Sequence, residues 1–249
     1  MSDILITGGT GKLGKVLSRL LAEKGIDHTL ASRRKPAGKG DWVFVDLLKK
    51  EGIEQAVADK KIIFHLAHDL KTDSDVTGNL LDALKGRADV HLIYVSIVGI
   101  DVVPMKYYRQ KLASEQAIAH SGIPYSILRA TQFHEYAEYV ISSFLRFSIG
   151  FLPQKILMQP IQIEVVAQEL MRISQGAPLN GIRQIGGPEV LSLGEMTKTW
   201  LKAVNKKRII LPLPLWNAAG KALKKGGLTL GTPNPESISW AEWLKRKYS

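Results

Sequence analysis

The sequence predicts an α/β protein in which helices cover both faces of a parallel sheet. Short apolar runs alternate with amphipathic stretches over the first 150 residues, and a glycine-rich turn follows the first apolar run. Such alternation is typical of parallel strands joined by crossover helices. With 249 residues, of which 45% are hydrophobic, the chain is long enough for one large core and a smaller lobe.

The expected elements follow one another in alternation from the N-terminus. Apolar runs predict strands at residues 4–7, 28–31, 42–45, 62–66, 91–96 and 125–129. Helical spacing of apolar residues predicts helices at residues 12–24, 52–59, 74–86, 107–121 and 133–147. Several of the expected strands are unbroken apolar runs, which is typical of strands buried on both faces.

The pattern changes after residue 150, where prolines interrupt the alternation. Residues 164–175 and 192–204 keep the helical spacing of apolar positions. Ser192 stands three positions before Glu195, which predicts a capping box at the start of the second of these helices. We therefore expect a smaller and less regular lobe in the last part of the chain.

Composition excludes several kinds of site. The chain has no cysteine, so disulfides, thiolate metal sites and cysteine nucleophiles are excluded, and the spacing of its six histidines does not suit a metal. We therefore expect no bound metal. The first residues lack the features of a signal peptide, and no apolar run approaches the roughly 18 residues of a spanning helix. The sequence predicts a cytoplasmic protein.

The formal net charge of +11 at pH 7 admits two interpretations. A basic surface attracts polyanions such as nucleic acid or anionic lipid. Alternatively, the lysines are scattered over solvent-exposed helix faces and over the C-terminal surface without a common role. Because we find no nucleic-acid recognition motif, we expect neither a nucleic acid nor a membrane as a partner.

A glycine-rich turn lies between the first expected strand and the first expected helix. Residues 4–14 read ILITGGTGKLG, which places Gly8, Gly11 and Gly14 three positions apart. The sharp turn, the approach of a pyrophosphate and the packing of helix on strand each leave little room for a Cβ. The pyrophosphate of a dinucleotide is then expected at the helix N-terminus, where free N–H groups favour anions. The sequence therefore predicts a Rossmann-type doubly wound sheet. The expected cofactor contacts from this loop are Thr7, Gly8, Gly9, Thr10, Gly11, Lys12, Leu13 and Gly14.

The end of the second expected strand discriminates between NAD and NADP. An NAD site keeps an acidic residue there for the adenosine ribose 2′-hydroxyl. This chain instead has Ser32, Arg33 and Arg34. A guanidinium fork matches the oxygens of a 2′-phosphate, which a carboxylate would repel. We therefore predict NADP(H) as the cofactor. The alternative is that these residues form a solvated basic turn.

Several motifs together resemble the NmrA-like group of atypical short-chain dehydrogenases/reductases. They are TGGTGKLG at 7–14, SRR at 32–34, DL at 46–47, HLA at 65–67 and SGIPYSILRATQF at 121–133. The resemblance covers nearly the whole chain. It implies that Asp46 and Leu47 lie near the adenine and that Ala67 lies beside the cofactor.

The same resemblance implies a division of the chain. Residues 1–150 would form the NAD(P)-binding domain, and residues 151–249 would form a lobe that caps the substrate. A strand near residues 182–186 would return from this lobe to the sheet. Phe133 ends the segment 121–133 and His134 follows it, and we expect both residues to contact the substrate.

Tyr107 and Lys111 stand four positions apart on an expected helix and therefore lie on one of its faces. In the family, such a tyrosine exchanges a proton with the substrate oxygen, and such a lysine holds the nicotinamide ribose. A nearby ammonium lowers the pKa of a phenol, which is otherwise near 10. Ser96 ends the fifth expected strand and matches the serine that positions the substrate oxygen. The resemblance therefore implies that Ser96, Tyr107 and Lys111 are catalytic.

Two departures from the family pattern leave alternatives open. Tyr108, next to Tyr107, is the alternative proton donor. HLAH at 65–68 replaces the classical asparagine-containing motif, so the full tetrad is not present. Many relatives of this group bind NADP(H) as sensors without turnover.

The sequence thus predicts an NADP(H)-dependent reductase of a small hydrophobic carbonyl, enone or quinone-like molecule. The alternative is an NADP(H)-binding redox sensor. The sequence leaves the substrate, the direction of hydride transfer and the oligomeric state open.

Overall fold

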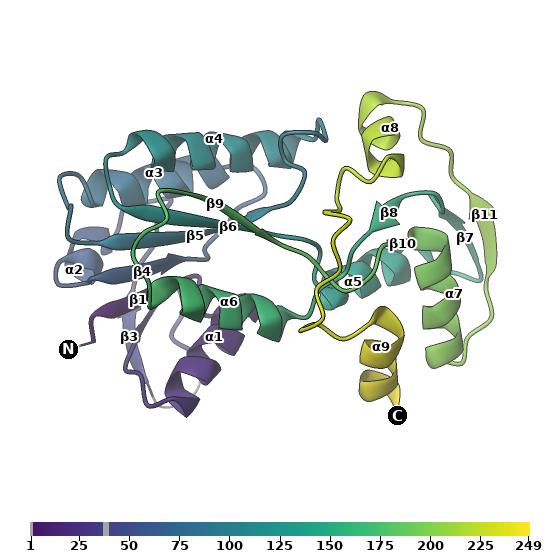
Figure 1. Cartoon of the computed structure of the whole chain (residues 1–249), viewed down its shortest axis with the longest axis horizontal. Coiled ribbons are helices and arrows are strands. Elements are labelled where there is room, and N and C mark those ends of the chain that lie inside the picture. Colours follow the sequence, from purple (N-terminus) through teal and green to yellow (C-terminus); the bar gives the residue numbers. More distant parts are fainter. Residues whose placement is uncertain (1, 37–39) are drawn as a thin grey trace. The chain divides into compact units, whose positions relative to one another are not determined.

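The computed structural model describes residues 2–36 and 40–249 of the chain, and its centre is a seven-stranded sheet (Figure 1). The strand order is β3-β2-β1-β4-β5-β6-β9, and the neighbouring strands from β3 to β5 pair in parallel. The strands are β1 (Ile4–Thr7), β2 (Thr29–Ser32), β3 (Asp41–Phe44), β4 (Ile62–His65), β5 (His91–Ile97), β6 (Tyr125–Ala130) and β9 (Gly181–Ile185). The predicted doubly wound fold is confirmed.

Helices cover both faces of this sheet (Figure 1). α3 and α4 lie on one face, and α1 and α6 lie on the other. The helices that join the sheet strands are α1 (Lys12–Glu23), α2 (Ile53–Val57), α3 (Asp73–Ala83), α4 (Lys106–His120) and α6 (Ile163–Ser174). The strand order reverses between β1 and β4, and the carboxyl ends of strands at such a reversal form the usual ligand crevice of this architecture.

The unbroken apolar runs of the sequence become buried strands. All four residues of β1 are buried, and Leu5, Ile63 and Leu92 belong to one apolar cluster that lies between the sheet and its helices. In α1 the buried positions Leu13, Leu17 and Leu21 repeat every four residues, so the helix presents one apolar face. The core of the sheet therefore positions the glycine turn at one end of β1.

The chain divides into two compact units that are each discontinuous in sequence. The first unit contains Met1–Ser96, Lys106–Arg129 and Val166–Arg183. The second contains Ile97–Met105, Ala130–Val165 and Gln184–Ser249. This division does not coincide with a boundary at residue 150, because most of α6 and β9 belongs to the sheet unit. The functional division into a cofactor domain and a capping lobe stays a prediction.

The second unit contains shorter elements around a separate apolar core. Its helices and strands are α5 (His134–Phe144), β7 (Ile149–Leu152), β8 (Leu157–Met158), β10 (Leu191–Ser192), α7 (Leu193–Ala203), β11 (Ile209–Pro212), α8 (Ala218–Lys224) and α9 (Trp240–Tyr248). β8 and β10 pair antiparallel, and β7 and β11 pair in parallel. The capping box of α7 is confirmed, since the Oγ of Ser192 accepts from the backbone N of Glu195 at 3.2 Å.

Within residues 2–36 and 40–249, the structure contains no helix with the length and apolar character needed to cross a membrane.

Candidate nucleotide site and its polar cluster

The glycine turn has the backbone geometry that the sequence predicts. Gly8 has a φ of +67°, and a Cβ at this position would lie 2.6 Å from the backbone N of Ala67. A Cβ on Gly14 would lie 2.5 Å from the carbonyl oxygen of Gly8. Gly11 is the N-cap of α1, and no side chain caps the first turn there. The first N–H groups of the helix are therefore available to an anion.

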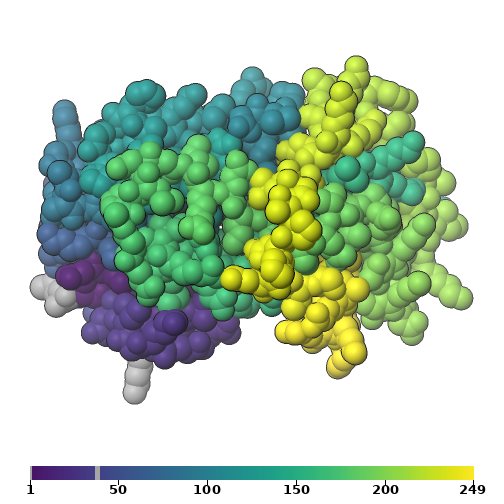
Figure 2. Space-filling view, in the orientation of Figure 1, coloured from purple at the N-terminus to yellow at the C-terminus, as the bar shows by residue number. Residues whose placement is uncertain are grey.

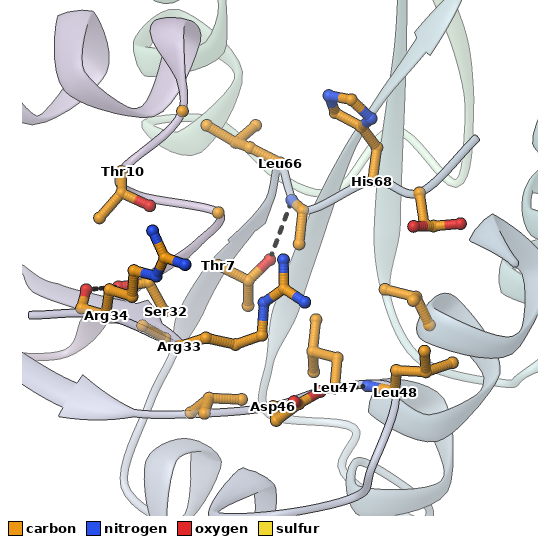
Figure 3. Close-up of a pocket in the computed structure, with 17 residues that line it drawn as sticks. Thr7, Thr10, Ser32, Arg33, Arg34, Asp46, Leu47, Leu48, Leu66 and His68 are labelled. Carbon is orange, nitrogen blue, oxygen red and sulfur yellow. Dashed lines mark hydrogen bonds between the residues drawn. The ribbon is translucent and has the colours of Figure 1, made fainter. Parts of the chain in front are cut away.

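A cavity of about 640 Å³ opens beside this turn within the first unit (Figure 3). The lining residues come from the ends of β1, β2 and β4 and from the segment after β3, and they are Thr7, Gly8, Thr10, Gly11, Ala31, Ser32, Arg33, Arg34, Val45, Asp46, Leu47, Leu48, Leu66, Ala67, His68, Asp69 and Val76. Ten of the residues expected to contact a cofactor are among them.

The other expected contacts are placed differently. Leu13 and Gly14 are buried in α1, and Gly9 lies against the side chain of Leu30. Lys12 is exposed at the start of the helix. None of these residues lines the cavity, although Lys12 and Gly14 shape the helix end that faces it.

Two guanidinium groups stand at the cavity. Arg33 and Arg34 are both exposed, and Figure 3 shows their side chains pointing toward Thr7 and Thr10. Neither arginine forms an ion pair within the described part of the chain. The Oγ of Ser32 donates to the carbonyl oxygen of Arg34 at 2.7 Å and thereby fixes the turn.

Asp46, one of the two acidic residues that line the cavity, is engaged by its own loop. The Oδ1 of Asp46 accepts from the backbone N of Leu48 at 3.1 Å and of Lys49 at 3.2 Å. Asp46 follows β3 and not β2, so the end of β2 carries no carboxylate. The cavity therefore has a positive edge at the place where a dinucleotide of this architecture puts its adenosine ribose.

The expected catalytic serine and tyrosine lie at the ends of β5 and α4. Ser96 is 2% exposed, and its Oγ has no hydrogen-bond partner among the described residues. Tyr107 is half-buried, whereas Tyr108 is buried, and their ring centroids are 6.2 Å apart. The greater exposure of Tyr107 favours it over Tyr108 as the residue that reaches a substrate.

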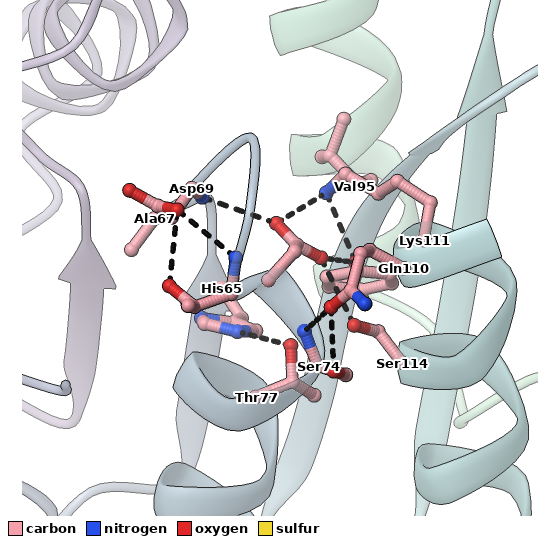
Figure 4. Close-up of polar contacts among 12 residues, drawn as sticks. His65, Ala67, Asp69, Ser74, Thr77, Val95, Gln110, Lys111 and Ser114 are labelled. Atoms are coloured by element: carbon pink, nitrogen blue, oxygen red, sulfur yellow. Dashed lines mark hydrogen bonds and ion pairs between the residues drawn. The ribbon is translucent and has the colours of Figure 1, made fainter. Parts of the chain in front are cut away.

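Lys111 is held inside a buried polar cluster between α3 and α4 (Figure 4). Its Nζ donates to the hydroxyl of Tyr94 at 2.9 Å and to the carbonyl oxygen of Val95 at 3.2 Å, and it lies 3.4 Å from Oδ1 of Asp73. The Oδ2 of Asp73 accepts from the Tyr94 hydroxyl at 2.7 Å and from the Ser114 hydroxyl at 2.9 Å. Every polar atom at the centre of this cluster is thus paired.

Burial and charge oppose each other in this cluster. Burial alone would raise the pKa of Asp73, but the Lys111 charge and the hydrogen bonds from Tyr94 and Ser114 hold it below its ordinary value. Burial lowers the pKa of Lys111, and Asp73 opposes that shift. Burial, reinforced by Asp73, raises the pKa of Tyr94 well above its ordinary value. Tyr94 therefore stays protonated and bridges the two charged groups.

His65 connects the cluster to the cavity wall. Its Nδ1 is 2.8 Å from the hydroxyl of Thr7, and its Nε2 is 3.1 Å from the hydroxyl of Thr77. The imidazole stacks on the ring of Tyr94 at a centroid distance of 5.4 Å. Burial lowers the pKa of His65 to about 3, so the ring is neutral at physiological pH. Neutral His65 matches one hydroxyl as a donor and the other as an acceptor.

The structure places Phe133 and His134 in the second unit, at the start of α5. His134 is fully buried and stacks with Trp240 and Trp243 at centroid distances of 5.9 and 5.4 Å. Burial lowers its pKa to about 4. Phe133 is partly buried and forms a bridge with Ile161. Neither residue lines the cavity described above, and their substrate contacts stay predictions.

Comparison with known families shows to which family the chain belongs. A family model described as NAD(P)H-binding matches residues 8–142, which is more than half of the chain. The chain belongs to the NAD(P)H-binding family. The matched segment contains the glycine turn, the arginine pair and the Lys111 cluster. No curated protein sequence matches the chain significantly.

Solved structures share the fold of this NAD(P)H-binding protein over its whole length. NADPH-dependent quinone oxidoreductase QOR2 from Escherichia coli, in complex with NADPH, is 16% identical with a TM-score of 0.80, over 99% of this chain and 100% of that one. UDP-N-acetylglucosamine 4-epimerase from Bacillus cereus is 17% identical with a TM-score of 0.72, over 100% and 96%. MoeE5, in complex with UDP-glucuronic acid and NAD, is 16% identical with a TM-score of 0.74, over 99% and 100%.

These comparisons agree with the resemblance to atypical short-chain dehydrogenases/reductases. The family match supports a nicotinamide cofactor for this chain. One of the similar structures holds NADPH and another holds NAD, so the fold itself accepts either dinucleotide. Within the described residues, no cluster of histidine and carboxylate side chains is arranged to hold a metal ion.

Sequence reasoning missed two residues of the site, Asp73 and Tyr94. Asp73 immediately precedes the helix expected at residues 74–86, where an acidic residue is ordinarily explained by the helix dipole. Tyr94 lies within a buried strand and looks like a core residue. Only the approach of β5, α3 and α4 brings them to Lys111, and no sequence spacing encodes that approach.

Proposed function

We propose that the protein is an NADP(H)-dependent oxidoreductase that reduces a small hydrophobic carbonyl, enone or quinone-like molecule. The pair Arg33 and Arg34 at the end of β2 carries the cofactor half of this proposal. A 2′-phosphate bears nearly two negative charges, and two guanidinium groups that form no ion pair with the described residues suit it. The closed turn at Gly8 and Gly14 fits a pyrophosphate on the N-terminus of α1.

Ser96 and Tyr107 carry the catalytic half of the proposal. Bound nicotinamide supplies the hydride in this chemistry. The Tyr107 hydroxyl donates a proton to the oxygen of the substrate, and the Ser96 Oγ–H donates a hydrogen bond that holds this oxygen in place. The Oγ of Ser96 is buried and has no hydrogen-bond partner among the described residues. The cost of removing this hydroxyl from water is therefore already met before a substrate binds.

Binding of NADPH and NADH to the purified chain tests the cofactor half. We expect tighter binding of NADPH, and we expect Arg33→Ala with Arg34→Ala to weaken NADPH binding by about tenfold or more while NADH binding changes little. Arg19→Ala, an exposed arginine on the outer face of α1, is the matched control. Equal affinities of the two cofactors for the unaltered chain would contradict NADP(H) selection.

Oxidation of NADPH against a panel of quinones, enones and aldehydes tests the catalytic half. Tyr107→Phe should lower kcat by about 100-fold or more, because general acid catalysis contributes that much. Tyr108→Phe is the control, since the buried Tyr108 ring keeps its packing after the loss of the hydroxyl. Loss of activity in Tyr108→Phe with retention in Tyr107→Phe would show that Tyr108, and not Tyr107, donates the proton.

A second candidate, an NADP(H)-binding sensor, is favoured by one observation. Lys111 is engaged by Asp73, Tyr94 and Val95 and is only 4% exposed. A lysine that stays in this cluster leaves the nicotinamide ribose without its usual partner. NADPH binding without turnover on every member of the panel, unchanged by Tyr107→Phe, would support the sensor.

A further inference from the structure

The two-stranded β7–β11 sheet of the second unit has one apolar face that is exposed. Ile209 pairs with Ile149 and Leu211 pairs with Phe151. Since side chains alternate along a strand, these four residues lie on one face. They are 59, 52, 40 and 56% exposed, respectively, whereas the alternate position Leu152 on the other face is fully buried. We call these four residues the apolar face.

Two aromatic side chains flank the apolar face along the chain. Phe147 precedes β7 and is 72% exposed, and Trp216 follows β11 and is 78% exposed. In Figure 2 the yellow-green atoms of the stretch after β11 lie at the surface. A groove of about 540 Å³ adjoins the ends of both strands, and its lining contains Pro153, Leu213 and Trp216 together with two lysines. Contiguous exposed apolar surface of this kind marks an interaction site.

The two segments that contain the apolar face and the groove carry positive charge alone. No aspartate or glutamate occurs in residues 139–163 or 196–235, which contain both strands and the groove. Ten cationic residues occur there, namely Arg146, Lys155, Lys198, Lys202, Lys206, Lys207, Arg208, Lys221, Lys224 and Lys225. None of these ten forms an ion pair with any residue in 2–36 or 40–249.

We propose that the apolar face docks on the surface of a bilayer that contains anionic phospholipid. Its aliphatic and aromatic side chains would enter the interfacial layer, where tryptophan is favoured. The lysines and arginines of these two segments would contact the lipid phosphates. This inference goes beyond the proposed function and replaces the expectation of no membrane partner, which considered the charge without its arrangement.

The charge distribution argues against a second copy of the chain as the occupant. Two copies joined through this face would bring two acid-free basic segments together, and like charges across an interface are costly. The apolar side chains argue against nucleic acid, which is recognised mainly through phosphate contacts and would leave Phe151 and Ile209 without a partner. A bilayer surface satisfies the basic and the apolar residues together.

Co-sedimentation of the full chain with vesicles tests this proposal. The vesicles are phosphatidylcholine alone and phosphatidylcholine mixed with phosphatidylglycerol. We expect binding to the mixed vesicles only, and weaker binding as salt is raised. Lys206→Gln with Lys207→Gln should weaken partition by about 30-fold. Lys15→Gln with Lys24→Gln, two exposed lysines of the first unit, should leave it unchanged.

A second pair of variants tests the apolar contribution. Phe151→Ser with Ile209→Ser should weaken partition into mixed vesicles by about tenfold or more. The matched control is Leu70→Ser with Val102→Ser, which removes two exposed apolar side chains elsewhere. An unchanged midpoint of thermal unfolding shows that each variant is folded. Absence of binding to mixed vesicles, or equal loss in control and test variants, would overturn the proposal. So would a lipid-free dimer, detected by light scattering, that Phe151→Ser with Ile209→Ser abolishes.

Discussion

Asp73 and Lys111 form a buried ion pair whose members each depend on the other. Both side chains are almost entirely removed from water, at 0 and 5% exposure. Removal of one partner from such a pair leaves an uncompensated charge, which costs more than the pair itself contributes. The hydroxyls of Tyr94 and Ser114 add hydrogen bonds to the Asp73 carboxylate, so the pair is fixed in one geometry.

The pair therefore leads to a stability prediction. Asp73→Asn should lower the free energy of unfolding by about 3 to 5 kcal/mol, because Lys111 then stays buried without a counter-charge. Asp75→Asn, an exposed carboxylate on the same helix, should change it by less than about 0.5 kcal/mol. Urea denaturation measures both. Asp73→Asn combined with Lys111→Met should recover part of the loss, and a strictly additive double variant would contradict the coupling.

His65 leads to a prediction about pH. Its pKa falls from 6.5 in the unfolded chain to about 3 in the folded protein, so the unfolded state binds more protons between these values. The stability contributed by neutral His65 is fully present above pH 6.5 and is lost as pH falls toward 3. His65→Gln should remove about one proton from the pH dependence of unfolding in this window.

Thermal unfolding at a series of pH values measures this dependence. His120→Gln, at an exposed position near the end of α4, is the control and should keep the steeper dependence of the unaltered protein. Asp73 acts in the same direction at lower pH, because its lowered pKa means that its contribution is lost as pH falls below 3.8. A pH profile that is identical before and after His65→Gln would show that the imidazole is not the group that titrates.

At the scale of elements, α1 and α3 each contain a glycine inside the helix, at Gly14 and Gly78. A Cβ on Gly14 would lie 2.5 Å from the carbonyl oxygen of Gly8, whereas a Cβ on Gly78 would meet no atom within 4 Å. Intrinsic propensity favours alanine over glycine equally at both positions. Substitutions at these two positions therefore distinguish the effect of packing on stability from the effect of helix propensity.

The contrast can be measured with two alanine variants. Gly78→Ala should raise the free energy of unfolding by about 0.5 to 1 kcal/mol. Gly14→Ala should lower it and should weaken NADPH binding, because α1 must move away from the turn that holds the pyrophosphate. Denaturation and NADPH titration of both variants test this difference. Equal effects of the two substitutions would show that the turn tolerates the added carbon.

Many of the elements could be predicted from the sequence, and the exceptions have physical reasons. β1, α1 and β5 follow directly from apolar runs and helical spacing, because each buries one continuous core surface. β8 and β10 are two residues long and exist only through their mutual pairing, so no periodicity predicts them. α9 carried a usable signal, since Ser239 caps it three residues before Glu242.

The candidate site likewise has one part that the sequence predicts and one part that it does not. The cofactor cavity is built from local motifs, and a glycine turn or an arginine pair is visible in a single stretch of sequence. The polar cluster depends on side chains from β5, α3 and α4 that meet only after folding. Burial of Tyr108 beside half-buried Tyr107 is likewise a tertiary property, since both residues have the same chemistry and neighbouring positions.

For the whole molecule, the second unit depends on its last helix. Trp240 is fully buried, belongs to the apolar core of that unit and donates from its Nε1 to the carbonyl oxygen of Met196 at 3.0 Å. Trp216, in the same unit, is 78% exposed. Tryptophan therefore occurs in this unit both fully buried in the core and largely exposed at the surface.

Alanine substitution should separate the two tryptophans clearly. Trp240→Ala should lower the free energy of unfolding by about 3 to 5 kcal/mol, since it leaves a large cavity. Trp216→Ala should stay within about 0.5 kcal/mol. Calorimetry of both variants provides the comparison. A large loss from Trp216→Ala would mean that its indole is packed in solution.

The discontinuous first unit has a consequence for synthesis. β6 is complete at Ala130, but its neighbour in the sheet, β9, begins only at Gly181. At ordinary elongation rates of about 5 to 20 residues per second, the ribosome needs roughly 3 to 10 s to cover that interval. Throughout it, the nascent sheet presents an open hydrogen-bonding edge, which is the feature that promotes unwanted strand pairing. The chain is therefore most in need of chaperone protection after β6 has emerged and before β9 has done so.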